Sequence, residues 1–224
     1  MKIIVTGATG LVGAEVLRQA ISDNRIEEVT AIVRKPLEIT HPKIKTVLHQ
    51  DFTDYSNLSE LFKKHDACAW CLGISQSQVN KEEYSVITYD YALAAAKAML
   101  QANPAITFLF LSGMGADSTE KSSTLFARVK GKTENALKKL GLKKLFIVRP
   151  GGIRPIHKNK NTSFVNKLMI PVFPLFQLLI PSMVITSVEL AKVILFIIKN
   201  GSDMELLENK DLRNLISKTT VQPA

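Results

Sequence analysis

The sequence predicts an α/β protein built on a doubly wound parallel sheet of the Rossmann type. Short apolar runs alternate with amphipathic helical patterns up to about residue 150, and a glycine-rich turn directly follows the first run. Nearly continuous apolar runs are expected for strands with helices on both sheet faces, and their alternation with helices implies parallel strands. In such sheets ligands bind beyond the carboxyl ends of the strands, so the residues after each run are the candidates for a site.

The first run, Lys2–Thr6, leads into the turn that carries Gly7, Gly10 and Gly13, and a helix is predicted over 12–21. Glycines allow a sharp turn and a close approach of the backbone to a pyrophosphate. The helix amino terminus then offers unpaired N–H groups and a partial positive charge to that anion. A glycine-rich loop without a ligand is the alternative.

The remaining elements follow in order to residue 150. We expect further strands at Glu28–Val33, Ile44–Leu48, 67–72, Thr107–Leu111 and 145–148, and helices at 58–64, 81–101 and 124–140. Beyond residue 150 we expect a loop, then a helix from Ser187 to a stop at Gly201, then a short helix and a tail. The length of 224 residues suits one domain, with its core at about 1–150 and 182–200 and a small lobe at about 151–181 and 201–224.

An apolar segment runs from Phe164 to Ile185 and is interrupted by three prolines, Pro171, Pro174 and Pro181. Its uncharged part is long enough for a transmembrane span, but the prolines argue against one continuous helix. A lid or wall over an apolar substrate site, a piece of the core, and a peripheral membrane contact remain open.

The net charge of +9 fits a solvated lysine-rich surface, and a bound polyanion, a phosphorylated cofactor or an acidic membrane face are the alternatives. No aromatic residues interleave with a basic stripe, so a nucleic-acid partner is not expected. Cys68 and Cys71 lie three apart on a predicted strand and face opposite sides, so we expect neither a disulfide nor a metal. Unpaired cysteines and the lack of a signal-peptide pattern predict a cytoplasmic location.

Polar residues follow the second and third runs. Arg34 and Lys35 stand where an NAD site usually carries an acid, and two cations there suit a 2′-phosphate, which favours NADP(H). Two surface cations at a strand end are the alternative. Asp51, followed by Phe52, could accept from an adenine amino group or could simply begin a turn.

The fourth and fifth runs end in Leu72-Gly73 and in Ser112. Gly73 would let the chain pass close under a cofactor. The Ser112 hydroxyl would face a reaction centre, although a serine that caps a turn is at least as good an interpretation.

These motifs occur together in a fixed order: the turn from Thr6 to Gly13, Asp51-Phe52, Leu72-Gly73, Lys130 in a helix after Ser112, and Arg149-Pro150-Gly151-Gly152-Ile153. Over about residues 1–200 the chain resembles atypical short-chain dehydrogenases/reductases. It is most similar to the NAD(P)-binding oxidoreductase-like branch that includes the Tat-interacting tumour-suppressor oxidoreductase, and to epimerase/dehydratase-like proteins.

The resemblance implies roles for individual residues. The glycine turn, with Thr9, Leu11 and Val12, would hold the pyrophosphate, and Arg34 and Lys35 the 2′-phosphate. Asp51 and Phe52 would lie at the adenine and Leu72 and Gly73 beneath the cofactor. Lys130 would bond the nicotinamide ribose, and Pro150, Gly151 and Ile153 would face the carboxamide. Ser112 and Lys130 are the expected catalytic residues. The helices at 81–101 and 124–140 correspond to those that form a homodimer interface in this superfamily.

One departure bears on activity. Members of the family carry a tyrosine four residues before the lysine, and this tyrosine gives a proton to the substrate oxygen; here the position is Phe126. Two functions therefore stand: an NADP(H)-dependent oxidoreductase or epimerase acting on an apolar or nucleotide-linked substrate, or a non-catalytic NADP(H) sensor or interaction module. Whether the chain is an enzyme is left open by the sequence.

Overall fold

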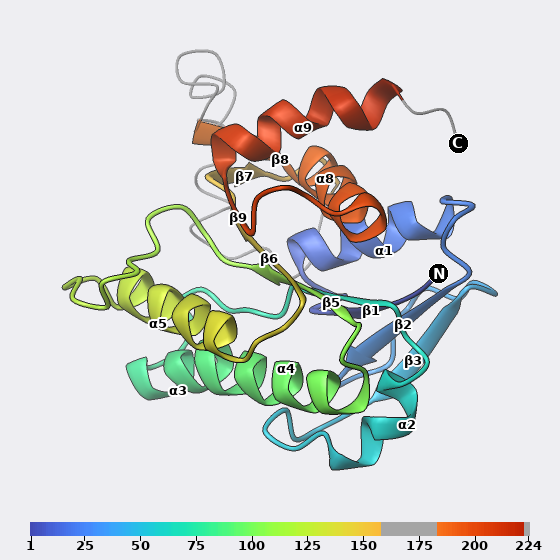
Figure 1. Cartoon of the computed structure of the whole chain (residues 1–224), viewed down its shortest axis with the longest axis horizontal. Coiled ribbons are helices and arrows are strands. Elements are labelled where there is room, and N and C mark those ends of the chain that lie inside the picture. The colour runs from blue at the N-terminus through green and yellow to red at the C-terminus, as the bar shows by residue number, and fades with distance from the viewer. Residues whose placement is uncertain (158–182, 222–224) are drawn as a thin grey trace.

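A computed structural model of the chain describes residues 1–157 and 183–221 (Figure 1). Seven parallel strands form one sheet in the order β3-β2-β1-β4-β5-β6-β9. In chain order they are β1 Lys2–Thr6, β2 Glu28–Val33, β3 Ile44–Leu48, β4 Ala67–Trp70, β5 Thr107–Leu111, β6 Lys144–Arg149 and β9 Leu206–Glu208. A separate parallel pair joins β7 Gly152–Arg154 to β8 Val184–Thr186. The reversal of strand order between β1 and β4 is the position at which doubly wound sheets bind nucleotides.

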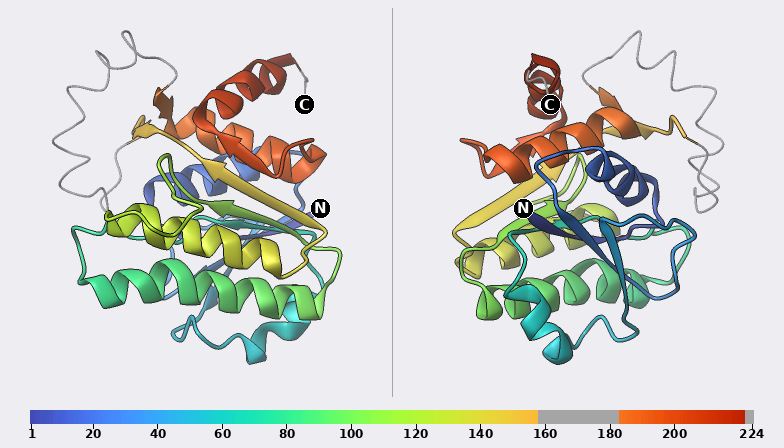
Figure 2. Two further views of the ribbon diagram at one scale, coloured as in Figure 1. Left: turned by 60° about the vertical axis from the view of Figure 1, so that its left-hand side comes forward. Right: turned by 90° about the vertical axis from the view of Figure 1, so that its right-hand side faces the viewer.

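Helices cover both faces of the sheet (Figures 1 and 2). One face carries α1 Leu11–Ile21, α8 Ser187–Asn200 and, outside α8, α9 Asn209–Val221. The other carries α2 Ser59–Phe62, α4 Tyr91–Ala102 and α5 Leu125–Lys139, with the 3-10 turn Ser56–Leu58 before α2. Ile3 and Val5 enter the core under α1 and α8, and Ile4 enters the core under α4. Successive strand side chains alternate between faces, so the sheet separates two cores.

The fold class predicted from the sequence is confirmed, and several strands have the predicted bounds. The predicted helix 58–64 is instead a 3-10 turn followed by one α-helical turn. The predicted helix 81–101 is α3 Lys81–Ser85, a π-helical turn Val86–Asp90 and α4 in succession. Inside that π turn, the Thr88 carbonyl accepts a hydrogen bond from Thr133 of α5 at 3.4 Å.

The carboxyl-terminal part was predicted less completely. The helix from Ser187 is present, and its amino terminus has a capping box in which Thr186 and Glu189 bond each other's backbone N–H groups. β9 pairs with β6 in the main sheet, whereas the sequence placed residues 201–224 in the small lobe.

Most of the apolar segment 164–185 lies outside the described residues, as does most of the stretch 151–181 assigned to the small lobe. Of that segment, Val184 and Ile185 are buried in β8. Within residues 1–157 and 183–221, no helix combines the length and the apolarity that a membrane span requires.

Candidate functional site

The glycine turn connects β1 to α1 and depends on contacts within the backbone itself. Gly7 has a φ of +64°, and a β-carbon there would lie 2.5 Å from the Cys71 carbonyl oxygen. A β-carbon on Gly13 would lie 2.3 Å from the Gly7 carbonyl oxygen, which also accepts the Gly10 N–H at 2.8 Å. The chain's own packing therefore requires glycine at positions 7 and 13.

The turn leaves the amino terminus of α1 without a side-chain cap. Gly10 is the N-cap, with extended backbone angles and no capping side chain. The first N–H groups of a helix have no partner within the helix and attract anions. Thr9 is exposed, Leu11 is half-buried, and the Val12 side chain lies in the core, so only the backbone of Val12 could reach a ligand. Uncapped N–H groups at the strand-order reversal fit the pyrophosphate of a dinucleotide.

The residues proposed for the adenosine half follow β2 and β3. Arg34 and Lys35 are exposed directly after β2, and Gln50 bonds the Arg34 carbonyl oxygen at 2.8 Å. Asp51 begins a turn: its Oδ1 accepts hydrogen bonds from the Thr53 hydroxyl and N–H, and these bonds lower the pKa of its carboxyl. Phe52 is buried against other aromatic rings. Asp51 therefore begins a turn, and its contact with an adenine stays a prediction.

β4 pairs with β1 and ends just before Cys71, Leu72 and Gly73. These residues therefore lie at the same carboxyl edge of the sheet as the glycine turn. The Leu72 N–H donates to the Thr6 hydroxyl at 3.2 Å, and a β-carbon on Gly73 would meet no atom within 4 Å. Cys68 and Cys71 are both free thiols and pack into different cores, as the strand register predicted. Burial raises the pKa of the Cys71 thiol to about 12, partly offset by Lys130.

Ser112 belongs to a buried polar cluster that sequence reasoning missed. Its hydroxyl donates to Glu134 Oε1, and Glu134 is fully buried on α5. Arg149, at the end of β6, donates to both Glu134 oxygens, to Glu208 Oε1 at 2.9 Å and to the Ser118 hydroxyl at 3.1 Å. We call Ser112, Ser118, Glu134, Arg149 and Glu208 the Glu134 cluster. The available sequence signal was Glu134 itself, a charged residue on the buried face of the predicted helix 124–140.

Lys130 lies in the same region, on the preceding turn of α5. It is buried, its Nζ donates to the Leu111 carbonyl oxygen at 2.9 Å, and it stands 4.7 Å from the centre of the Phe110 ring. Burial lowers the pKa of Lys130 to about 8, although the Glu134 carboxylate and Cys71 act in the opposite direction.

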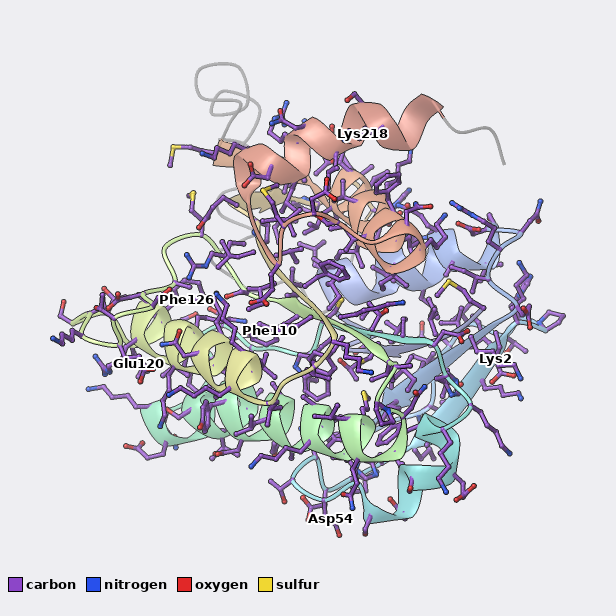
Figure 3. The ribbon with its side chains drawn as sticks, viewed as in Figure 1. Lys2, Asp54, Phe110, Glu120, Phe126 and Lys218 are labelled. Carbon is purple, nitrogen blue, oxygen red and sulfur yellow. The ribbon has the colours of Figure 1, made fainter. Side chains whose placement is uncertain are left out.

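Phe126 is half-buried one turn before Lys130, near the start of α5 (Figure 3). Its ring tip contacts Gly113, where a β-carbon would lie 2.7 Å from Phe126 Cζ. The structure thus brings Phe126, Lys130 and Ser112 together at the carboxyl end of β5.

The residues proposed for the carboxamide follow β6. Pro150 is buried and its carbonyl oxygen accepts the Met114 N–H at 2.8 Å. The Gly151 N–H donates to Asn209 Oδ1 at 2.9 Å, and a β-carbon on Gly151 would lie 2.1 Å from the Met183 carbonyl oxygen. Ile153 packs against the α1 core from β7. These groups make close contacts within the protein, and Gly151 allows β7 to approach β8.

A second buried carboxylate, Glu15, ties α1 to the loop after β7, and the sequence analysis missed it. Glu15 accepts hydrogen bonds from Gln19 at 3.0 Å and His157 at 2.9 Å and pairs with Arg18. Burial raises the pKa of Glu15, but these hydrogen bonds and the Arg18 charge outweigh that and leave it below its ordinary value. A charged residue on the buried face of a helix pattern was the available signal.

The glycine turn, the uncapped helix and the strand order define the fold of a dinucleotide-binding protein. A family model described as NAD(P)H-binding matches residues 7–169. The chain belongs to this NAD(P)H-binding family, which confirms the resemblance found in the sequence.

Known proteins similar to this chain support that assignment. HTATIP2 of Rattus norvegicus is 30% identical over 152 residues, covering 66% of this chain and 61% of HTATIP2, so the match spans less than two thirds of that relative. The structure also resembles the Bordetella bronchiseptica enzyme WbmH in complex with NAD+, with a TM-score of 0.69 at 14% identity, covering 100% of this chain and 82% of WbmH. The latter likeness shows the fold alone.

One comparison corrects the predicted location. The FMP52 protein of Candida albicans, 29% identical over 160 residues and covering 68% of this chain and 67% of that protein, is named mitochondrial. FMP52 proteins of other fungi carry the same description. The cytoplasmic location expected from unpaired cysteines was therefore wrong: a reducing environment for thiols does not by itself distinguish these compartments.

Proposed function

We propose that this chain is an NADP(H)-dependent oxidoreductase that reduces a carbonyl group on an apolar or nucleotide-linked substrate. The observation that carries the proposal is the uncapped amino terminus of α1 at the strand-order reversal, held there by the Gly7–Gly13 backbone contact. When bound, the dinucleotide would supply the hydride. We expect Ser112, after β5, and Lys130, which reaches the end of β5 from α5, to face the reaction centre.

The preference for NADP(H) rests on charge after β2. Arg34 and Lys35 are exposed there, so their cationic groups can reach a phosphate in solvent. Charge-assisted hydrogen bonds to phosphate are stronger than neutral ones, whereas an acid at this point would accept from a ribose hydroxyl.

Replacing both cations by acids, Arg34→Glu with Lys35→Glu, should reverse the cofactor preference. We expect the affinity for NADPH to fall by ~10²–10⁴-fold, because two charge-assisted hydrogen bonds of about 1.5–3 kcal/mol each are lost. Titration of intrinsic fluorescence with NADPH and NADH measures both affinities.

The matched control is Lys64→Glu. Lys64 is exposed and precedes β4, at the amino ends of the strands and away from the proposed site, so both affinities should stay unchanged. Equal affinity of the wild-type protein for NADPH and NADH would contradict the role given to Arg34 and Lys35.

The second candidate is a non-catalytic protein that binds NADP(H) and responds to its redox state. Two observations favour it. Phe126 has no proton to give, and the Ser112 hydroxyl is committed to Glu134. A general acid is typically worth ~10²–10⁴-fold in rate, so carbonyl reduction without one is slow.

The variant Phe126→Tyr separates the two candidates. A phenol oxygen would extend from the ring tip beside Gly113, on the same helix and one turn from Lys130. If the wild-type protein has no general acid, as the sensor requires, NADPH-dependent carbonyl reduction should rise by ~10²–10⁴-fold in a steady-state assay. Phe126→Leu, which restores no acid, is the control. Measurable turnover by the wild-type protein would rule out the sensor, and turnover confined to Phe126→Tyr would support it.

The substrate class, a homodimer through α4 and α5, and an apolar ligand or membrane contact through 164–185 remain proposals. Co-purification of an apolar ligand would support the last of these.

A further inference from the structure

The carboxyl end of β5 offers few groups that can give a proton to a substrate. The chain has four tyrosines, and each packs elsewhere. Tyr55 stacks on His49, Tyr84 is buried beside Thr88, Tyr89 lies under Lys132, and Tyr91 packs on Phe52. None of them is positioned to replace the missing phenol at Phe126.

Ser112 is also unable to donate. Its hydroxyl proton points to Glu134, whose carboxylate is held by two N–H groups of Arg149. A carboxylate only accepts, so the serine must be the donor in this bond. The Ser112 oxygen can still accept a hydrogen bond, but its proton is occupied.

Among residues 1–157 and 183–221, the protic groups left beside this site are the Cys71 thiol, whose pKa burial raises to about 12, and the more acidic Lys130 ammonium. Lys130 Nζ carries three protons, of which one bonds the Leu111 carbonyl oxygen and the ammonium lies over the face of Phe110. Figure 3 labels Phe126, on α5, and Phe110, on β5. Glu134, the nearest acidic residue in the sequence, forms an ion pair with Arg149. Its carboxylate therefore neutralises only part of the positive charge of the buried Lys130.

We propose that the Lys130 ammonium is the general acid of this protein and takes the role that a tyrosine has in related reductases. The inference rests on the proposed function. Hydride from the reduced dinucleotide adds to the carbonyl carbon, and the electron pair of the C=O bond moves to oxygen. That oxygen takes a proton from Lys130 Nζ, leaving a neutral amine that water reprotonates. The dinucleotide is oxidised and the carbonyl is reduced to an alcohol.

The environment of Lys130 makes this role testable by pH. The groups that face it are Glu134 on the same helix, Cys71 after β4 and, through Glu134, Arg149 on β6. Burial lowers the pKa of Lys130 to about 8, close to the working range of a general acid. An acid acts in its protonated form, so kcat/KM should be constant at low pH and fall as pH rises through about 8.

The experiment measures NADPH-dependent reduction of aromatic carbonyls, 9,10-phenanthrenequinone and benzaldehyde, from pH 6 to pH 10. Lys130→Arg keeps the charge but cannot release a proton in this range. We expect kcat to fall by ~10²–10⁴-fold and the pH break to disappear, with the NADPH dissociation constant changed only slightly. Lys132→Arg, the same change two residues along on the exposed face of α5, should keep both rate and break.

Several outcomes overturn the proposal. One is a wild-type profile without a fall above neutral pH, which needs no variant. Another is a Lys130→Arg protein that binds NADPH and keeps the rate. If the wild-type protein binds NADPH but reduces neither carbonyl, the acid role of Lys130 fails while cofactor binding stands. If NADPH does not bind at all, the proposed function itself fails.

Discussion

Replacing Glu134 by alanine should destabilise the protein by about 3–5 kcal/mol, because it leaves the buried Arg149 guanidinium without its main partner. The Ser112 hydroxyl loses its acceptor at the same time. Arg149 would retain Glu208, but that carboxylate is 36% exposed and solvent weakens the pair. Urea unfolding followed by circular dichroism measures the loss as a lower midpoint.

Glu208→Ala is the matched control because it removes the more exposed partner of the same arginine. Ion pairs at exposed positions are typically worth about 0–1 kcal/mol, so this variant should unfold close to the wild-type midpoint. Equal midpoints for Glu134→Ala and the wild-type protein would show that the Glu134 cluster adds nothing to stability.

Gly131→Ala should have the second large effect, although alanine favours helices over glycine by about 1 kcal/mol. The added β-carbon would lie 1.8 Å from the Asp117 carbonyl oxygen, which belongs to the backbone and cannot rotate away. The loop around Asp117 is also held firmly, since its carboxylate accepts hydrogen bonds from Thr119, Lys121 and Ser122. We therefore expect a loss of at least about 1–3 kcal/mol.

This substitution should also affect function, because α5 carries Phe126 and Lys130. A helix displaced from the Asp117 loop moves Lys130 away from Leu111, so the NADPH affinity should fall together with the unfolding midpoint. Gly73→Ala is the control for stability: a β-carbon there meets nothing within 4 Å, and a change within about 0.5 kcal/mol is expected. A Gly131→Ala protein as stable as the wild-type protein would show that the added β-carbon does not clash with the Asp117 carbonyl oxygen.

The sequence predicted the fold well where each element has its own periodic signal. β1, β2, β3 and β5 have the predicted bounds, because their apolar runs are continuous between polar residues. The strands β7, β8 and β9 were not predicted, since each has only three residues and no alternation can be read from so short a run. The π turn at Val86–Asp90 was also missed, because it keeps a helical pattern while changing the hydrogen bonding.

The site was partly predictable for a similar reason. Glycine positions follow from local backbone geometry, and the structure shows why Gly7 and Gly13 have to be glycine. The partner of Ser112 is 22 residues away and that of Glu15 is 142 residues away. Such pairings arise only when distant elements meet in the fold, so the Glu134 cluster and the His157 contact had to come from the structure.

The position of β9 has a consequence for the order in which the protein is made. Ribosomes release a chain from its amino terminus, and early segments can begin to fold before late ones exist. β6 pairs with β9, and Arg149 reaches Glu208 across that pair, so the strand edge and half of the charge partners of Arg149 are missing until residue 208 has emerged. A nascent chain stalled before β9 would therefore expose one edge of β6, whose unpaired N–H and C=O groups can pair with a strand of another chain.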